Sequence, residues 1–576
     1  MLTLGINAAF HDSSACLVDD GRIVAAVEEE RLSGIKHGKR PTPFSAYELP
    51  FLSIDACLRE AGAWLRDVDQ IAYSFDPYLL LNGRAGDSTV TLPLEPSAQP
   101  VADEWESAWD PLFLSSIVNA PRHLAGGVPH RLARRFAGAA RDETYRWQFV
   151  EHHTAHAASA FLASPFESAA VLTLDGRGER ATTSYAIGRG TQIDRIGQVN
   201  MPHSLGLLYE RVTEYLGFLH SSDEYKVMAL ASFGEPAYLD EFRRIVHLGC
   251  DGQYTVAPLC LEQRFGPKRM PGLPFEQRHY DIARSLQGCL EETVLAIASW
   301  LQEATGERQL CMAGGVALNC VLNARLRDDG PFDDVWVQPA AGDDGTALGA
   351  ALWTDARVRR TGEHTTMRDA FLGPEFDDAE IERLLREAKV AYARPAALDD
   401  ECARLLVDGK IIGWYQGRME FGPRALGARS ILASPRDAAM QERLNAIKDR
   451  EDFRPVAPVV LADEMGEWFA PVQDSPFMLF THDVRPERAD CIPAVRHVDG
   501  TARVQSVDDA TNPRFAALLR TFRSRSGLPV LINTSFNTRG QPIVCTPRQA
   551  LECFFTTPLD ALAIGPFLLT KPEPSA

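Results

Sequence analysis

The alternation of apolar and polar positions near the N-terminus predicts three short strands. They cover Leu2–Asn7, Ser14–Asp19 and Arg22–Glu28. The Asp20-Gly21 pair between the last two favours a tight hairpin turn, because both residue types tolerate a positive φ. The chain is therefore expected to begin with a strand–turn–strand–turn–strand unit.

A similar unit recurs further along the chain. Ala169–Asp175 is an apolar strand pattern, a Gly-rich turn follows, and Ala181–Ile187 predicts the next strand. Gly188–Gly190 predicts another turn before a third, partly apolar strand. Each copy opens with a buried strand that ends near an acidic or polar residue, which indicates an internal duplication.

Helical periodicity dominates the middle of the chain and returns near its C-terminal third. His279–Thr305 carries apolar residues every three or four positions, the spacing of one helix face. The polar stretch RVRRTGEHTTM, residues 357–367, is suited to a linker. After it, Asp377–Ala388 and Leu398–Asp408 predict helices and Ile411–Tyr415 predicts a strand.

The length of 576 residues is too great for one hydrophobic core. We expect two domains, residues 1–365 and 366–576. Residues 77–144 are rich in Pro, Trp, Gly and Arg, and we expect them to form an insertion in the first domain.

Charge and cysteine content narrow the class of protein. The net charge of −19 argues against binding to nucleic acid or to an anionic membrane. The 11 cysteines show no CxxC spacing, so neither a zinc ribbon nor a disulfide framework is expected. The N-terminus lacks a basic leader and no apolar run is long enough to span a bilayer, so we expect a cytoplasmic protein.

Two histidines in the segment HHTAHAA suggest a metal site. His152 and His156 lie four residues apart in a sequence that favours a helix, so both can face one ion. Asp175 at a strand end and Asp343 in AAGDDG could add carboxylates, with the adjacent Asp344 as the alternative. Such a set suits Fe, Zn or Mn without choosing among them. The competing interpretation is a pair of ordinary core or surface histidines.

Two further segments suggest anion sites. In AGGVALNCVLN a strand runs into Gly314-Gly315 and a helix, a geometry that lets backbone approach a nucleotide, although it is also a common packing device. With the duplicated hairpins, it resembles the adenosine loop of the superfamily of actin, heat-shock chaperones and sugar kinases. In the C-terminal domain, basic residues stand among Gly, Pro, Phe and Asn and favour a phosphate pocket over a solvated basic face: Arg418, Arg424, Arg429, Lys448, Arg450, Arg454 and Arg539.

These segments together resemble the NodU/CmcH-type O-carbamoyltransferases. The matching stretches include FHDSSACLVDDGRIVAAVEEER, IKHG, HHTAHAASAF, LDGRGE, AGGVALN, GDDGTALGAA, FGPRALGARSILA, IKDREDFRP and NTSFNTRGQPIV. The resemblance implies an α/β fold with a duplicated actin-like, TsaD-like first domain and a YrdC-like, twisted open α/β second domain.

The implied reaction runs through two stages. Carbamoyl phosphate is hydrolysed to carbamate, which ATP with Mg²⁺ converts to carbamoyl adenylate and pyrophosphate. The carbamoyl group then passes to a hydroxyl of a small-molecule acceptor, such as an antibiotic, toxin or glycan-like natural product, and AMP leaves. The resemblance implies Fe²⁺ or another divalent metal, no nucleic-acid or membrane partner, and allows a homodimer.

The resemblance also implies roles for particular residues. The metal ligands would be His152, His156, Asp175 and Asp343. His11 would be the base at the acceptor hydroxyl, oriented by Asp12. Lys36, Gly176, Gly314, Gly315 and Asn319 would contact the nucleotide or adenylate. Carbamoyl phosphate and ATP would be bound by Arg424, Lys448, Arg454, Arg503, Asn533 and Ser535.

Two other functions remain open at the level of the sequence. One is an ATP-dependent sugar kinase of the actin-like superfamily, which would need neither the paired histidines nor a second anion site. The other is a nucleotide-switched component of tRNA modification, against which the net charge of −19 argues.

Overall fold

The computed structural model describes residues 1–38, 49–82, 145–360 and 365–571, with a few isolated positions between residues 82 and 145. Most of the predicted insertion, residues 77–144, lies outside this part of the chain. The chain forms two compact units, one of Met1–Glu30 with His37–Met367 and one of Arg31–Lys36 with Arg368–Ala576.

The first unit contains a five-stranded sheet built around the N-terminal strand. Its strand order is β3-β2-β1-β4-β7. The bounds are β1 Leu2–Asn7, β2 Ser14–Asp19, β3 Arg22–Glu28, β4 Gln70–Tyr73 and β7 Arg146–Phe149. The first three strands coincide with the predicted ones and pair antiparallel, whereas β4 runs parallel to β1 and to β7. Asp20 and Gly21 both have a positive φ, as the predicted turn requires.

A second five-stranded sheet repeats this arrangement. Its order is β10-β9-β8-β13-β14, with β8 Ser168–Leu174, β9 Ala181–Arg189, β10 Gln192–Asn200, β13 Gln309–Ala313 and β14 Asp334–Val337. Again three strands pair antiparallel and two run parallel to the first strand of the copy. The predicted duplication, and with it the actin-like fold class, is confirmed.

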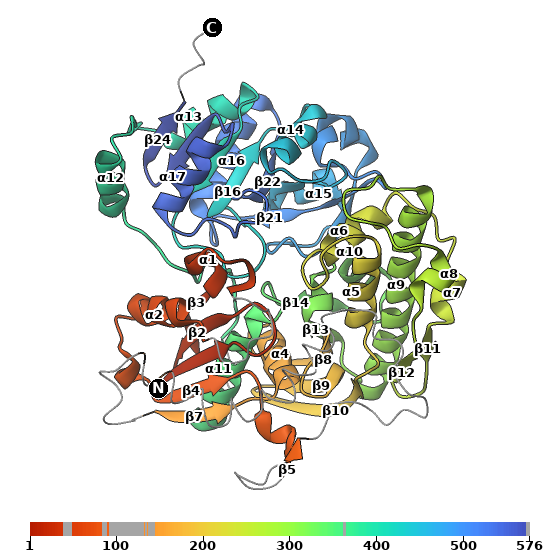
Figure 1. Cartoon of the computed structure of the whole chain (residues 1–576). Helices are drawn as coiled ribbons and strands as arrows, with labels where there is room; N and C mark the ends of the chain where they lie inside the picture. The colour runs from red at the N-terminus through yellow and green to blue at the C-terminus, as the bar shows by residue number, and fades with distance from the viewer. Residues whose placement is uncertain are drawn as a thin grey trace. The chain divides into compact units, whose positions relative to one another are not determined.

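Two helices pack between these sheets. Helix α11, Asp344–Arg359, packs on the first sheet, and helix α4, His152–Phe161, packs on the second and on α11 (Figure 1). Gly349 permits this approach, because a Cβ atom there would lie 1.7 Å from the carbonyl oxygen of Ala155. The helices thus bring segments from both copies to one place.

The remaining elements of the first unit surround these layers. The helices are α2 Phe51–Glu60, α5 Leu205–Tyr215, α6 Glu224–Ala231, α7 Leu239–Arg243, α8 Leu261–Phe265, α9 Gln277–Thr305 and α10 Cys320–Asp329, and β11 Val246–Leu248 pairs with β12 Tyr254–Val256. Helix α1, Glu29–Ser33, begins in the first unit and ends in the second. Helix α9 covers the helix predicted at His279–Thr305 and ends at Gly306, which has a left-handed backbone. No helix in the described ranges has the length and apolarity needed to cross a bilayer.

The second unit is built on a seven-stranded, open mixed sheet of order β21-β17-β22-β16-β15-β23-β24. Its strands are β15 Ile412–Tyr415, β16 Arg429–Ala433, β17 Ala457–Leu461, β21 Gln505–Val507, β22 Val530–Ser535, β23 Ala561–Ile564 and β24 Phe567–Thr570. A separate three-stranded sheet contains β18 Phe469–Ala470, β19 Thr481–Val484 and β20 Thr501–Arg503. The helices are α12 Asp378–Glu387, α13 Leu398–Val407, α14 Ala439–Ile447, α15 Met465–Trp468, α16 Pro513–Ser526 and α17 Pro547–Thr556.

The short segment Arg31–Lys36 clusters with the second unit although its neighbours in sequence belong to the first. The guanidinium of Arg31 donates to the carbonyl oxygen of Gly422 at 2.9 Å. Leu32 packs against Met419, Ile543 and Cys545. The second unit is therefore assembled from two stretches of the chain.

Candidate metal centre and anion site

Two histidine side chains meet at the start of helix α4. The helix begins at His152, so His156 lies one turn later on the same face, and both side chains are fully buried. Their Nε2 atoms are 3.1 Å apart and their ring planes are inclined at 87°. The predicted convergence of the two imidazoles is therefore present in the structure.

Two carboxylates complete the group. Asp175 follows β8 and Asp343 precedes α11, and each has an oxygen 3.4 Å from His152 Nε2. From His156 Nε2 the corresponding distances are 3.9 Å to Asp175 and 3.5 Å to Asp343. The four ligand atoms lie within 4.8 Å of one another. Asp344, the alternative ligand, is outside this group.

The arrangement fits a divalent cation. The donor atoms are spaced as they would be around an ion held at ~2.0–2.2 Å by imidazole and carboxylate. Burial alone would lower the pKa of His152, but Asp343 and Asp175 raise it well above its ordinary value. A buried pair of carboxylates beside two imidazoles therefore calls for positive charge at this point, which a metal ion would supply.

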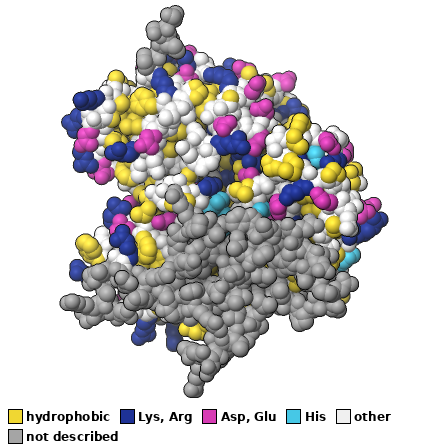
Figure 2. Space-filling view, in the orientation of Figure 1, with side chains coloured by type: hydrophobic (Ala, Val, Ile, Leu, Met, Phe, Trp, Pro, Cys, Tyr) yellow, Lys and Arg dark blue, Asp and Glu magenta, His cyan; other side chains and the backbone are white. Residues whose placement is uncertain are grey.

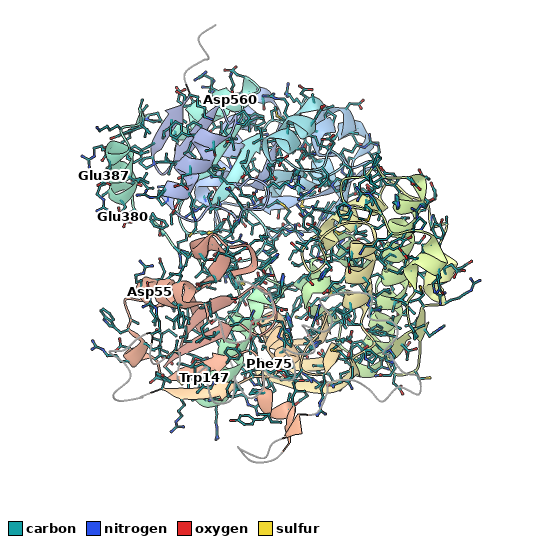
Figure 3. The ribbon with its side chains drawn as sticks, viewed as in Figure 1. Asp55, Phe75, Trp147, Glu380, Glu387 and Asp560 are labelled. Carbon is teal, nitrogen blue, oxygen red and sulfur yellow. The ribbon has the colours of Figure 1, made fainter. Side chains whose placement is uncertain are left out.

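Aromatic rings shield the metal centre from water on one side. The ring of Phe10 packs edge-on against His152, with centroids 4.9 Å apart, and against Phe75 at 5.4 Å. Figure 3 labels Phe75 among the side chains of the first unit. Phe10 and Phe75 are both buried. Low water access strengthens the electrostatic interactions inside the group.

A second polar cluster lies beside the first. Asn7 at the end of β1 donates to the carbonyl oxygens of His11 and Asp12 at 2.8 and 3.0 Å and so shapes the loop after the strand. The Nδ1 atom of His11 lies 2.9 Å from one oxygen of Asp12, and the Nδ1 atom of His37 lies 2.8 Å from the other. The backbone N–H of His11 donates to Asp343 Oδ2 at 3.0 Å.

Charge in this second cluster is shared between a carboxylate and two imidazoles. Burial opposes the ionisation of Asp12, but His11 and His37 hold its pKa well below the usual range. Burial likewise opposes protonation of His11, yet Asp12 raises the pKa of His11 to about 9. A divalent cation next to Asp343 would oppose that protonation, because like charges repel.

His37 was not singled out from the sequence, although the IKHG motif contains it. The expected contact residue was Lys36, which is exposed and groups with the second unit. His37 is half-buried and lies in the cluster of the first unit. The sequence signal for His37 was its position before Gly38, shortly after a run of acidic residues.

The glycines expected near a nucleotide surround Asp175. Gly314 has a φ of 95°, and a Cβ atom there would lie 2.1 Å from the carbonyl oxygen of Leu174, so only glycine fits. The N–H of Gly315 donates to Asp175 Oδ1 at 2.9 Å. The carbonyl of Gly176 accepts from Ser204 Oγ at 2.8 Å. These contacts tie the Gly-rich loop to a candidate metal ligand.

Asn319, expected near the nucleotide, has a structural role within the fold. Its side-chain oxygen accepts from the N–H of Leu322 and caps α10, at 3.0 Å. Its amide nitrogen donates to Gln287 at 2.8 Å. Both ends of the side chain are therefore engaged within the fold.

In the second unit, three of the expected anion-site residues come together: two lie on β22, and the third, Lys448, contacts that strand. Asn533 and Ser535 are alternate residues of this strand and so share a face. Lys448 donates to Ser535 Oγ at 3.0 Å and to Asn537 at 2.7 Å. Burial lowers the pKa of Lys448 well below its ordinary value, and Arg450 and Arg454 lower it further. A buried amine close to two arginines favours the binding of an anion at this place.

The loop that contains Arg424 is joined to the same strand. Asn533 donates to the carbonyl oxygen of Ala425 at 3.0 Å and to Gln505 at 2.7 Å. The Asn533 Oδ1 atom is buried and has no hydrogen-bond partner in the described part of the chain. Arg503 ends β20 of the three-stranded sheet.

Two arginines of the basic stretch are structural. Arg429 is fully buried, and its guanidinium donates to backbone carbonyls including those of Gln416 and Gly417, at 3.0 and 3.1 Å. Arg418 donates to the carbonyls of Gly373 and Leu372, at 3.1 and 2.6 Å. Their donors are used inside the fold, which corrects the expectation that all the basic residues face an anion.

Glu420 is a buried acidic residue within the basic stretch, and the sequence pattern did not predict its role. One of its oxygens accepts from the N–H groups of Leu426, Ala428 and Arg429, at 2.8, 2.7 and 3.0 Å. The other oxygen is buried and has no hydrogen-bond partner among the described residues. An acid inside a basic run was the signal in the sequence, and its role is to shape the loop after Arg424.

Charge over the visible described surface is mixed in sign. Figure 2 shows basic and acidic side chains interspersed on this face.

Comparison with known proteins decides the family. A family model described as the carbamoyltransferase N-terminus matches residues 2–79 and 138–352, and one described as the carbamoyltransferase C-terminus matches residues 403–571. The chain belongs to the carbamoyltransferase family. The family resemblance inferred from the motifs is thereby confirmed, and the unmatched residues 80–137 fall within the predicted insertion.

Individual relatives of this carbamoyltransferase extend over most of its length. An uncharacterized protein of Synechocystis is 41% identical and covers 99% of this chain and 96% of its own. Nodulation protein NolNO of Sinorhizobium fredii is 39% identical and covers 98% of this chain and 80% of its own. Nodulation protein U of Bradyrhizobium diazoefficiens is 31% identical, with 94% and 93% covered.

Proposed function

We propose that this carbamoyltransferase is an ATP-dependent O-carbamoyltransferase that modifies a hydroxyl group of a small molecule. Carbamoyl phosphate is hydrolysed to carbamate and phosphate. Carbamate and ATP form carbamoyl adenylate and pyrophosphate, and the carbamoyl group then passes to the hydroxyl while AMP leaves. The observation that carries the proposal is the contact of two clusters, in which the N–H of His11 donates to Asp343 Oδ2 at 3.0 Å.

The second unit supplies the residues for the carbamoyl phosphate stage. Lys448 and Arg454 provide positive charge, and Ser535 provides a hydroxyl next to the Lys448 amine, at 3.0 Å. The buried Oδ1 atom of Asn533 can accept a hydrogen bond from the amino group of the carbamoyl moiety. Phosphate binding by such groups is strong because both partners are charged.

The first unit supplies the residues for transfer. A divalent ion held by His152, His156, Asp175 and Asp343, with Fe²⁺ the expected one, would polarise the carbonyl under attack and hold the adenylate. Asp12 accepts the Nδ1 proton of His11, which leaves Nε2 as the atom that can take the proton of the acceptor hydroxyl. The oxygen of the acceptor then bonds to the carbamoyl carbon, and the bond to the AMP phosphate breaks.

The two family matches also support the proposal. The N-terminal carbamoyltransferase model matches in the first unit and the C-terminal one in the second, which supports a reaction divided between the two units. A sugar kinase would need neither the second unit nor the buried group of two histidines and two carboxylates. A component of tRNA modification would need a basic surface, whereas the net charge is −19.

An experiment that needs no acceptor tests the first stage. The whole chain is incubated with ATP, Mg²⁺ and labelled pyrophosphate, with and without carbamoyl phosphate, and incorporation of label into ATP is measured. We expect exchange only with carbamoyl phosphate. Arg454→Ala should reduce it, and Arg404→Ala, in an exposed arginine of α13 paired with Glu401, should not.

The nucleotide product separates the alternatives. With a polyol as acceptor, the proposed enzyme releases AMP, a sugar kinase releases ADP, and a binding component releases neither. Formation of ADP with a phosphorylated polyol, without pyrophosphate exchange, would replace the proposal by a kinase.

A further inference from the structure

The carboxylate of Asp12 lies between two imidazole rings. One oxygen is 2.9 Å from His11 Nδ1 and the other is 2.8 Å from His37 Nδ1. The ring centroids of His11 and His37 are 4.1 Å apart. Each histidine nitrogen therefore faces a different oxygen of the same carboxylate.

The chemistry of the carboxylate fixes the direction of these bonds. An ionised carboxylate only accepts hydrogen bonds, so both Nδ1 atoms must carry the hydrogen. In a neutral imidazole, Nε2 is then an acceptor. His37 Nε2 lies 3.1 Å from Ser222 Oγ, so the serine hydroxyl donates to it. Ser222 therefore donates a hydrogen bond to His37, and His37 and His11 each donate one to Asp12.

The position of His37 is held by its backbone as well. Its N–H donates to Glu30 at 2.9 Å, and its φ is 64°. Asp12 also has a positive φ, of 44°. Side chains other than glycine adopt this backbone at an energetic cost, which the surrounding contacts must offset. Two such residues facing each other indicate a preorganised arrangement.

Hydrogen bonding describes this cluster better than metal coordination. The nitrogen–oxygen distances of 2.8 and 2.9 Å are those of direct charge-assisted hydrogen bonds. In the candidate metal centre the corresponding distances are 3.4 to 3.9 Å and leave room for an ion. His37 and His11 thus act as donors to Asp12.

We propose that His37 is a positioning residue for carbamoyl transfer, which rests on the proposed function. His37 binds one oxygen of Asp12, so the carboxylate cannot rotate away from His11. Asp12 in turn holds His11 with Nδ1 protonated and Nε2 free. Without His37, the Oδ1 atom of Asp12 loses its donor, and the orientation of His11 is no longer fixed. Ser222 contributes more weakly, by orienting the His37 ring.

The backbone at position 37 allows a matched pair of variants. His37→Gly removes the side chain and suits a positive φ. His37→Asn also tolerates a positive φ, and its amide nitrogen can replace Nδ1 as the donor to Asp12. Both residue types tolerate the positive φ, and the main difference between the two variants is the donor to Asp12. His247→Asn, on the exposed part of β11, is the control.

Transfer is measured as AMP release from added carbamoyl adenylate, with water or glycerol as the acceptor. We expect His37→Gly to lower the rate constant roughly 10- to 100-fold, the usual scale for removing a supporting hydrogen bond. His37→Asn should recover most of the rate. Pyrophosphate exchange dependent on carbamoyl phosphate should stay at the wild-type level in both variants.

A second readout follows the hydrogen bonds themselves. In protein labelled with nitrogen-15 at histidine, we expect a protonated Nδ1 on His11 in the wild type and in His37→Asn, with faster solvent exchange of that proton in His37→Gly. Equal AMP release and equal exchange in wild type and His37→Gly would overturn the role of His37. A second divalent ion per chain that is lost in His37→Asn would also overturn it, in favour of metal coordination. If the wild type shows no pyrophosphate exchange that depends on carbamoyl phosphate, the proposed function is overturned instead.

Discussion

The backbone N–H of His11 donates to the side chain of Asp343 at 3.0 Å, although the two residues come from opposite ends of the first unit. Asp343 also has an oxygen 3.4 Å from His152 Nε2. One hydrogen bond therefore joins the candidate base to the candidate metal centre. Since the donor is a backbone group, it survives any change of the His11 side chain other than to proline.

We expect His11→Ala to slow transfer strongly and to leave metal binding unchanged. Removing a general base typically costs about 100-fold or more in rate. AMP release from carbamoyl adenylate should fall by that factor, while metal content and pyrophosphate exchange remain at the wild-type level. Near wild-type AMP release would show that the acceptor hydroxyl needs no base at this position.

The metal centre should bind one divalent ion per chain, which His152→Ala and His156→Ala each lose. The buried carboxylates of Asp175 and Asp343 would then lack a second imidazole to complete the ligand set. Elemental analysis measures the ion, and carbamoyl phosphate-dependent exchange should persist. His153→Asn is the control, because His153 lies in the same helix but its Nδ1 faces Ser184 at 3.2 Å. Active protein without metal would refute the assignment.

Gly349→Ala should weaken metal binding from a distance. The added Cβ would lie 1.7 Å from the carbonyl oxygen of Ala155, so α11 and α4 must separate. Overpacking of this kind costs about 1–3 kcal/mol of stability. Because α4 contains both histidines and α11 follows Asp343, we expect a lower metal affinity in titrations with a competing chelator. Ala350→Gly, at the next position of the helix, would be destabilising without forcing the helices apart.

Phosphate binding in the second unit should depend on pH through Lys448. Burial, with Arg450 and Arg454, lowers the pKa of Lys448 in the free protein well below 10.5. A bound anion favours the charged amine and raises that pKa, so binding takes up a proton at pH values between the two. Affinity for inorganic phosphate should therefore fall as the pH rises through this interval. Calorimetry in buffers of different ionisation enthalpy measures the proton uptake.

Lys448→Met provides the comparison for this titration. It should bind phosphate more weakly and lose the proton uptake assigned to Lys448. The same linkage makes the free protein more stable as the pH rises from the lowered pKa toward 10.5, because the unfolded chain binds the extra proton in that range. Proton uptake unchanged in Lys448→Met would assign the effect to another group.

The arginines of the basic stretch should include some that bind carbamoyl phosphate and others that stabilise the fold. Arg424→Ala and Arg454→Ala should reduce consumption of carbamoyl phosphate, each by the loss of about 1.5–3 kcal/mol of charge-assisted binding. Added carbamoyl adenylate should restore transfer in both. Arg429→Lys should instead lower the free energy of unfolding by about 3 kcal/mol, since an ammonium cannot replace the several backbone contacts of the buried guanidinium. Denaturant unfolding measures this loss, and a stable Arg429→Lys with weak phosphate binding would contradict the division.

The local sequence pattern was sufficient to predict the first strands and the convergence of the candidate metal ligands. It was insufficient to predict which basic residues are buried within the fold. The strands Leu2–Asn7, Ser14–Asp19 and Arg22–Glu28 follow from alternation and turn residues, so their bounds agree with the structure. The histidines of α4 follow from a four-residue spacing. The burial of Arg429 depends on carbonyls brought together by distant loops, and no spacing in the sequence encodes it.

His37 shows the same limit at the candidate site. Its partners Asp12 and Ser222 lie far from it in the sequence, and its orientation depends on a left-handed backbone held by Glu30. The family resemblance instead implied the neighbouring Lys36 as a contact to the adenylate. Only the folded arrangement distinguishes the two residues.

The segment Arg31–Lys36 determines how this protein can be divided. A fragment that begins at Arg368 would lack the guanidinium that binds the Gly422 carbonyl and the leucine that covers Met419, Ile543 and Cys545. The complementary fragment would expose that leucine to water. Cutting the gene at the apparent junction would therefore yield two incomplete pieces, and a separable second half needs the six-residue segment supplied in trans or grafted onto its start.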